Sequence, residues 1–184
     1  MRFRAFLLVS LDGYAAGPGD AMDWHDAWFT YFGPAYQAFI ATVGPVVIGR
    51  RTFEKALGIE DWKLADGPWP GRDTWVMTSR PLTRAIPRVT PWHDGATRLV
   101  EHLRSTRPGA DTWVMGGPET LYPFREAGAI DQYDLFVAPV LLGGGTPWSG
   151  GRAASAPLAL AGQRAYPDGL VHLTYRPAGG PNAA

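Results

Sequence analysis

A five-residue segment that occurs twice constrains the fold of this chain more than any other feature. Asp-Thr-Trp-Val-Met stands at residues 73–77 and again, letter for letter, at residues 111–115. Each copy is a short β-prone run that leads into a turn, and a similar apolar run at 45–48 leads into Gly49. Short continuous apolar runs of this kind are typical of strands that are buried on both faces of a parallel sheet.

Helical patterns separate these strand candidates. Apolar spacing, capping residues and terminating glycines predict helices over 34–42, 53–57, 97–107 and 118–127. Further strands are expected at 3–9, 133–142 and 170–175, and the last two are joined without a clear helix. Alternating strands and helices favour a parallel sheet, whereas consecutive strands favour antiparallel pairing. We therefore expect a three-layer α/β fold, with a mostly parallel central sheet, helices on both faces and an antiparallel C-terminal edge.

The chain has the length and composition of one folded domain. With 184 residues, 46% of them hydrophobic, it is long enough to bury a single core. We assign residues 1–176 to that domain. Residues 177–184 are Pro, Ala, Gly and Asn with nothing to bury, so we expect them to form a flexible tail.

Charge, cysteine content and hydropathy exclude several functional classes. Seventeen basic and seventeen acidic residues cancel, so no net field favours a nucleic acid or an anionic membrane. The absence of cysteine excludes thiol catalysis and thiolate metal sites, and the four histidines show no ligand spacing, so we expect no metal. No apolar run reaches the roughly 20 residues that cross a bilayer, and the run at 5–9 is too short for a secretion signal. We expect a cytoplasmic protein.

Residues suited to anion binding follow three of the expected strands. Two arginines and a hydroxyl follow Gly49, two hydroxyls and an arginine follow the first copy of the repeat, and Gly116-Gly117 follows the second. In an open α/β sheet ligands bind beyond the carboxyl ends of the strands, where helix N-termini and arginines attract phosphate. Each turn alone also occurs in proteins that bind nothing. Together they predict a site for a dinucleotide that carries more than two phosphate charges.

The fingerprints of the common nucleotide-binding and hydrolytic folds are missing. No Gly-x-Gly-x-x-Gly follows the first strand, and the sequence contains neither a Walker A loop nor a Gly-x-Ser-x-Gly elbow. Ordinary Rossmann enzymes, P-loop NTPases and α/β-hydrolases are therefore disfavoured.

Five segments together resemble a known family. Residues 46–54, 78–81 and 114–117 resemble the dihydrofolate reductase fold. Ser-Leu-Asp-Gly-Tyr at 10–14 and the segment 136–147 resemble more closely the reductase (C-terminal) domain of the bacterial bifunctional riboflavin biosynthesis protein. The resemblance spans roughly residues 2–176. It implies a three-layer dihydrofolate reductase-like fold, a homodimer, and NADPH-dependent reduction of a small heterocycle or related imine, as in 5-amino-6-(5-phosphoribosylamino)uracil reductase.

The resemblance also implies which residues hold NADPH. Arg50, Arg51 and Thr52 would contact the cofactor phosphates, with Arg51 preferred because adjacent residues on a helix point in different directions. Ser79 and Arg80 would hold the adenosine 2′-phosphate, and the residues from Gly116 onward would line the pyrophosphate and nicotinamide. The full set of expected cofactor-binding residues is Gly49, Arg50, Arg51, Thr52, Thr78, Ser79, Arg80, Gly116, Gly117, Pro118, Glu119, Thr120 and Leu121.

On the substrate side the resemblance implies a role for Asp12. A loop from Asp12 to about residue 28 would cover the nicotinamide, and Asp12, or a water that it holds, would handle the proton. Asp12-Gly13 also suits a plain tight turn. Dihydrofolate reductases carry an acid about five residues past a Trp in this loop, but here that position is Phe29. The expected substrate-binding residues are Asp12, Asp23, Trp24 and Phe53.

Three functions remain open from the sequence. A reductase of a riboflavin precursor, a pterin or another small metabolite is the leading hypothesis. A regulatory module that binds NADPH without turnover is the second. A genuine dihydrofolate reductase is the third, disfavoured by the missing acid.

Overall fold

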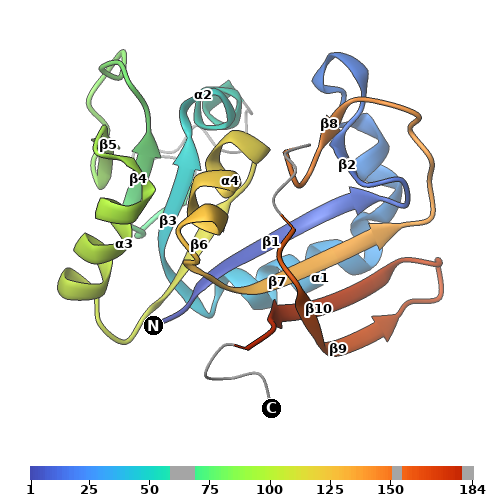
Figure 1. Ribbon diagram of the computed structural model, residues 1–184. Coiled ribbons are helices and arrows are strands. Elements are labelled where there is room, and N and C mark those ends of the chain that lie inside the picture. The colour runs from blue at the N-terminus through green and yellow to red at the C-terminus, as the bar shows by residue number, and fades with distance from the viewer. Residues whose placement is uncertain (59–68, 151–154, 180–184) are drawn as a thin grey trace.

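The computed structural model describes residues 1–58, 69–150 and 155–179, and its centre is one eight-stranded sheet (Figure 1). The strand order across the sheet is β5-β4-β3-β6-β1-β7-β10-β9. A separate two-stranded sheet pairs β2 with β8 above the ends of the central strands. The strands are β1 Phe3–Ser10, β2 Tyr14–Ala16, β3 Val43–Gly49, β4 Thr74–Met77, β5 Val89–Trp92, β6 Asp111–Met115, β7 Ile130–Ala138, β8 Thr146–Pro147, β9 Leu158–Ala165 and β10 Val171–Pro177.

The pairing directions confirm the expected mixed sheet. In the order across the sheet, β5, β4, β3, β6, β1 and β7 all run parallel. The two copies of the repeated pentapeptide form β4 and β6, which lie on either side of β3. β10 is antiparallel to β7, and β9 is antiparallel to β10. The result is an α/β fold with an antiparallel C-terminal edge.

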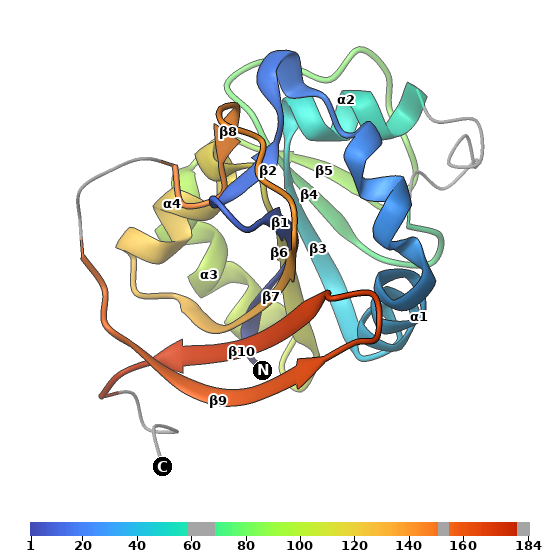
Figure 2. The same ribbon diagram turned by 90° about the vertical axis from the view of Figure 1, so that its right-hand side faces the viewer.

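Helices cover both faces of the sheet, as Figure 2 shows. α3 and α4 pack on one face, where Leu99 and Phe124 are buried with Val114. α1 and α2 pack on the other, where Phe39 and Phe53 are buried with Trp113. Neighbouring strand residues such as Trp113 and Val114 enter opposite cores because side chains alternate across a strand. The helices are α1 Phe29–Ile40, α2 Arg50–Gly58, α3 Gly95–Thr106 and α4 Pro118–Glu126, with 3-10 helices η1 Pro18–Asp20 and η2 Asp23–Trp28.

Several expected boundaries were wrong. α1 begins at Phe29 and contains Pro34, which was expected to start it. α2 begins at Arg50, so the two arginines lie in its first turn. β5 and β9 were not expected, and β7 covers 130–138 where a strand at 133–142 was expected. We expected a flexible tail over 177–184, and of these residues, those from 180 onward lie outside the described part of the chain. Within the described part of the chain, no helix is long and apolar enough to span a membrane.

Candidate functional site

A cleft of about 350 Å³ opens between α1, α2 and the lid formed by residues 13–28. Its floor is formed by Phe6, Leu7 and Leu8 of β1 and by Trp113 and Met115 near the C-terminal end of β6. Gly116, Gly117 and Pro118 line it from the turn after β6, and Thr146 and Trp148 line it from the segment around β8. The cleft therefore lies where an open α/β sheet is expected to bind its ligand.

The inner wall of the cleft is aromatic and aliphatic. α1 contributes Phe29, Phe32 and Tyr36, and β6 contributes Trp113 and Met115. The side chain of Phe29 is 49% exposed, although its ring contacts that of Phe32 edge to face at a centroid distance of 5.8 Å. A large apolar side chain that stays half exposed at a cleft is suited to contact a flat apolar ligand.

The polar wall carries two cations of α2 that share one carboxylate of the lid. Asp20 accepts hydrogen bonds from Arg51 Nη2 at 3.2 Å, from Lys55 Nζ at 3.2 Å and from Thr146 Oγ1 at 3.1 Å. The bonds from Lys55 and Thr146 lower the pKa of Asp20 below its usual 3.8. Its backbone φ of 62° is a left-handed conformation that non-glycine residues seldom adopt. The lid thus brings an anion to the two cations of α2.

Two glycine positions allow α4 to approach the floor of the cleft. A Cβ on Gly49 would collide with Thr120 Oγ1, and one on Gly116 would lie 2.9 Å from Leu7 Cδ2. Gly117 is the N-cap of α4, and its carbonyl oxygen accepts the N–H of Thr120 at 2.9 Å. Gly49 and Gly116 thus serve close packing within the protein, whereas a Cβ on Gly117 would have no neighbour nearer than 3.9 Å, so the backbone is bare at Gly117 beside the helix N-terminus.

Arg50 and Arg51 have different surroundings. Arg51 lines the cleft, whereas Arg50 bonds Glu54 Oε1 at 2.7 Å and the carbonyl oxygen of Pro81 at 2.9 Å. Arg50 thereby ties α2 to the turn after β4. In that turn the backbone N–H of Arg80 donates to Thr78 Oγ1 at 3.1 Å. Ser79 and Arg80 are exposed and are not among the residues that line the cleft.

Asp12 holds two loops together. Its carboxylate accepts the hydroxyl of Ser10 at 2.6 Å and the backbone N–H of Leu142 and Gly143, the latter at 2.8 Å. The bond from Ser10 and those from the two backbone N–H groups lower its pKa, so the carboxylate is ionised at neutral pH. Asp12 does not line the cleft, but the loop that it holds leads to Thr146 and Trp148, which do.

The structure places the remaining expected substrate residues outside the cleft lining and adds His25 to it. Asp23 is exposed, Trp24 packs against the core, and Phe53 is only 1% exposed. Met22 and His25 face the cleft instead, three residues apart on a 3-10 turn. His25 Nε2 lies 3.3 Å from the carbonyl oxygen of Ala15, and burial lowers the pKa of its imidazole. Had residues 22–28 been interpreted as a 3-10 turn, its three-residue spacing would have placed Met22 and His25 on one face.

Of the expected cofactor residues of α4, one lines the cleft and the others do not. Thr120 and Leu121 are buried, 5% and 3% exposed, so only their backbone is near the turn, whereas Pro118 lines the cleft. Glu119 is not among the residues that line the cleft. Of the expected cofactor residues, the fold therefore brings five to the cleft lining: Arg51, Thr52, Gly116, Gly117 and Pro118.

The sequence of this chain matches a known protein family. The family model of the RibD C-terminal domain matches residues 69–172, more than half of the chain. The chain belongs to the RibD C-terminal domain family. The uncharacterized protein YwjB of Bacillus subtilis (strain 168) is 31% identical to it over 144 residues, covering 77% of this chain and 79% of YwjB.

Solved structures related to this RibD-type domain share its fold. A putative riboflavin biosynthesis protein from Shewanella sp. PV-4 superposes with a TM-score of 0.77 at 21% identity, covering 96% of this chain and 99% of that one. Dihydrofolate reductase from Enterococcus faecalis, complexed with NADP(H) and RAB-propyl, superposes with a TM-score of 0.63 at 18% identity, covering 96% of both chains. The dihydrofolate reductase-like fold and the reductase-domain family are thus both confirmed.

Proposed function

We propose that this RibD-type domain is an NADPH-dependent reductase that transfers hydride to a C=N or C=O group of a small heterocycle. The observation that carries the proposal is the meeting of four elements at one cleft: the Gly116–Gly117 turn, the start of α2, the lid and an aromatic wall. Reductase-domain membership supports the reaction class, and the NADP(H) of the enterococcal reductase supports the cofactor.

The residues of the cleft fit a dinucleotide. At Gly117, the N-cap of α4, an added Cβ would have no neighbour nearer than Thr52 Oγ1 at 3.9 Å, so a pyrophosphate would be able to approach the bare backbone there, beside the positive end of the α4 helix dipole. Arg51 and Thr52 would bind phosphate at the start of α2, with Gly49 and Arg50 supporting that turn. Thr78, Ser79 and Arg80 would hold the adenosine 2′-phosphate. When bound, NADPH supplies a hydride from its nicotinamide.

The aromatic wall would hold the substrate beside the nicotinamide and exclude water from it. Asp12 remains our predicted proton-handling residue, whereas the buried Phe53 would support the cleft from the core and not touch the substrate. Because the Asp12 carboxylate is ionised and occupied by three donors, it would act through a water that it holds and orients. His25, on the cleft wall, is the residue with which Asp12 would share this task.

The assignment of the 2′-phosphate site is tested by cofactor discrimination. Arg80→Ala is expected to weaken NADPH binding about tenfold or more while leaving NADH binding unchanged, because a charge-assisted bond contributes about 1.5–3 kcal/mol. Tryptophan fluorescence reports binding, since Trp113 and Trp148 line the cleft. Arg84→Ala, also exposed and four residues further along the same segment, is the matched control. Equal losses for both cofactors would refute the assignment, and no response to millimolar NADPH would refute the function.

A binding module without turnover is the second candidate. It is favoured by the single carboxylate of the described cleft lining, Asp20, which is already neutralised by Arg51 and Lys55. NADPH binding without oxidation across a panel of imines and dihydropterins would support it. Steady oxidation with any member of the panel would exclude it.

A further inference from the structure

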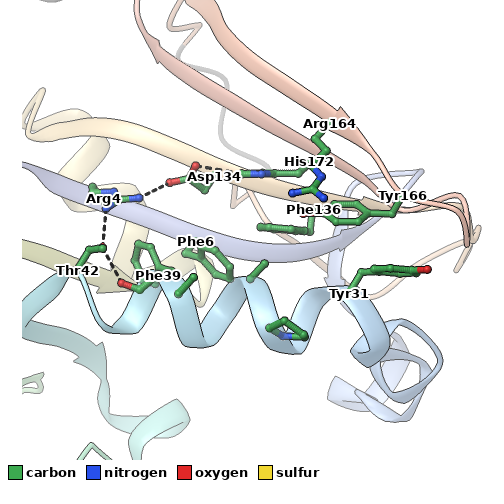
Figure 3. Close-up of a pocket in the computed structure, with 13 residues that line it drawn as sticks. Arg4, Phe6, Tyr31, Phe39, Thr42, Asp134, Phe136, Arg164, Tyr166 and His172 are labelled. Atoms are coloured by element: carbon green, nitrogen blue, oxygen red, sulfur yellow. Dashed lines mark hydrogen bonds and ion pairs between the residues drawn. The ribbon is translucent and has the colours of Figure 1, made fainter.

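A second hollow of about 520 Å³ lies on the other side of α1, between that helix and the β9–β10 hairpin (Figure 3). We call it the outer groove. Tyr31, Ala35 and Ala38 line it from α1, at the three- to four-residue spacing of one helix face. Phe29, Phe32 and Tyr36 line the cleft from a different face of the same helix. The two hollows share Phe6 of β1 and otherwise have different lining residues, so the outer groove is a hollow of its own on the other side of α1.

The walls of the outer groove are flat rings. The imidazole of His172 stacks on the ring of Phe136, with centroids 4.1 Å apart and planes 7° from parallel. Beside this pair, Tyr31 reaches from α1 toward Tyr166 on the hairpin, at a centroid distance of 5.2 Å (Figure 3). On the α1 side the small side chains of Ala35 and Ala38 leave room. A slot with aromatic walls and a small-residue side suits a planar ring.

The charges that line the outer groove do not cancel. Asp134 is its one carboxylate among the described lining residues, and the two arginines are Arg4 and Arg164. Arg4 Nη2 pairs with Asp134 at 3.2 Å, so this pair is internally neutral. Arg164 lies over the ring of Tyr166 at 4.8 Å, and no carboxylate pairs with it within the described ranges of the chain. One cation is thus left at the aromatic end of the groove.

We propose that the outer groove is a second binding site, which takes a flat aromatic molecule that carries one anionic group. The ring lies between the aromatic wall and the alanines of α1, and the anion meets the guanidinium of Arg164. Arginine suits this position because its planar group both stacks on a ring and binds an anion through two N–H donors. The site does not depend on the identity of the cofactor or the substrate of the cleft.

A pair of fluorescent probes that differ in charge tests the proposal. The anionic probe is 8-anilino-1-naphthalenesulfonate, and the uncharged probe is N-phenyl-1-naphthylamine. The anionic probe is expected to bind saturably to one site and to bind at least about tenfold more tightly than the uncharged one. Saturating NADPH is expected to leave it bound, because the cleft lies on the other side of α1.

Three variants locate the probe. Arg164→Gln is expected to weaken the anionic probe about tenfold and to leave the uncharged one unchanged. Ala38→Phe, at an exposed position of α1 that faces the groove, is expected to abolish binding of both. Arg98→Gln, an exposed arginine on α3 at the other face of the sheet, is the matched control and is expected to change nothing. Circular dichroism and thermal unfolding of each variant show that it is folded.

Three results would overturn the proposal. Displacement of the probe by NADPH, or indifference to both Arg164→Gln and Ala38→Phe, would place the probe elsewhere. Absence of saturable binding, together with a change of molecular mass in Ala38→Phe, would show that the groove is covered by a second copy of the chain.

Discussion

The buried carboxylate of Asp134 gives a stability prediction with a defined magnitude. Asp134 is 3% exposed and accepts hydrogen bonds from Arg4 at 3.2 Å, Gln132 at 2.8 Å, His172 at 3.1 Å and Thr174 at 3.0 Å. Burial alone would raise its pKa, but the bonds from His172 and Gln132 and the charge of Arg4 outweigh burial and lower the pKa to about 2. At about 1.4 kcal/mol per unit, the fall from 3.8 stabilises the folded state by about 2 kcal/mol.

Asp134→Asn removes that charge and leaves Asp111, 3.8 Å from Arg4 Nη1, as the counter-ion of Arg4. We expect a loss of about 2–3 kcal/mol at pH 7, because the charge-assisted hydrogen bonds of the carboxylate are lost while Arg4 keeps one partner. Because the folded-state pKa is depressed, the wild-type contribution is present above pH 3.8 and is lost as the pH falls toward 2. The difference between variant and wild type should therefore be constant between pH 7 and 5 and become smaller below pH 4.

Urea unfolding followed by tryptophan fluorescence measures this difference. Asp73→Asn is the matched control, since Asp73 also pairs with two arginines, Arg88 and Arg107, but lies at the surface with a 27% exposed side chain. Exposed pairs of that kind contribute about 0–1 kcal/mol. If Asp134→Asn costs no more than Asp73→Asn, or if its cost is independent of pH down to 3, the reasoning is refuted.

Three further predictions concern the cleft. Burial lowers the pKa of His25, so its imidazole should titrate below 6.5 in an NMR pH series of the folded protein and return to about 6.5 in urea; a folded-state value above 6.5 would contradict this. Gly145→Ala should cost about 1–3 kcal/mol and separate the β2–β8 pair, because Gly145 has a φ of 124° and its Cβ would collide with the carbonyl oxygen of Ala16; Gly144→Ala, with no neighbour nearer than 4.0 Å, is the control for unfolding measurements. Phe29→Asp, which places an acid at the start of α1, should reduce dihydrofolate with NADPH at least about a hundredfold faster than the wild type or Phe29→Asn; equal rates for the Asp and Asn variants would contradict it.

The elements that could be predicted from the sequence are those whose pattern matches their surroundings. The apolar runs of β3, β4 and β6 are buried on both faces, and their composition shows it. β5 contains Pro91 and lies at the sheet edge, where proline is tolerated, so its pattern resembles a loop. β9 reads Leu-Ala-Leu-Ala-Gly-Gln-Arg-Ala, which has little β propensity, and its pairing with β10 is a tertiary effect.

The residues of the cleft were predictable to the extent that they follow strand ends. Arg51, Thr52 and the Gly116–Gly117 turn fall there by topology alone, since parallel strands end at one edge. The side chains of the lid were missed because we expected residues 23–28 to belong to an irregular loop, whereas the 3-10 turn there presents Met22 and His25 to the cleft in place of their neighbours Asp23 and Trp24. Burial of Phe53 and Leu121 follows from helix periodicity, which assigns those positions to the core.

The contact between Asp20 and α2 joins the predictable and the unpredictable parts of the site. Arg51 and Lys55 stand four residues apart on one helix, and the fold brings a carboxylate to them from a lid residue in a left-handed backbone conformation. Such exposed pairs are weak because water screens them, so a phosphate that makes bidentate contacts with Arg51 is able to replace the carboxylate. Binding of a phosphorylated cofactor at α2 would then release Asp20, which is bonded to Thr146 and belongs to the segment that covers the aromatic wall. Cofactor binding and the position of the lid are therefore coupled through one carboxylate in our proposal.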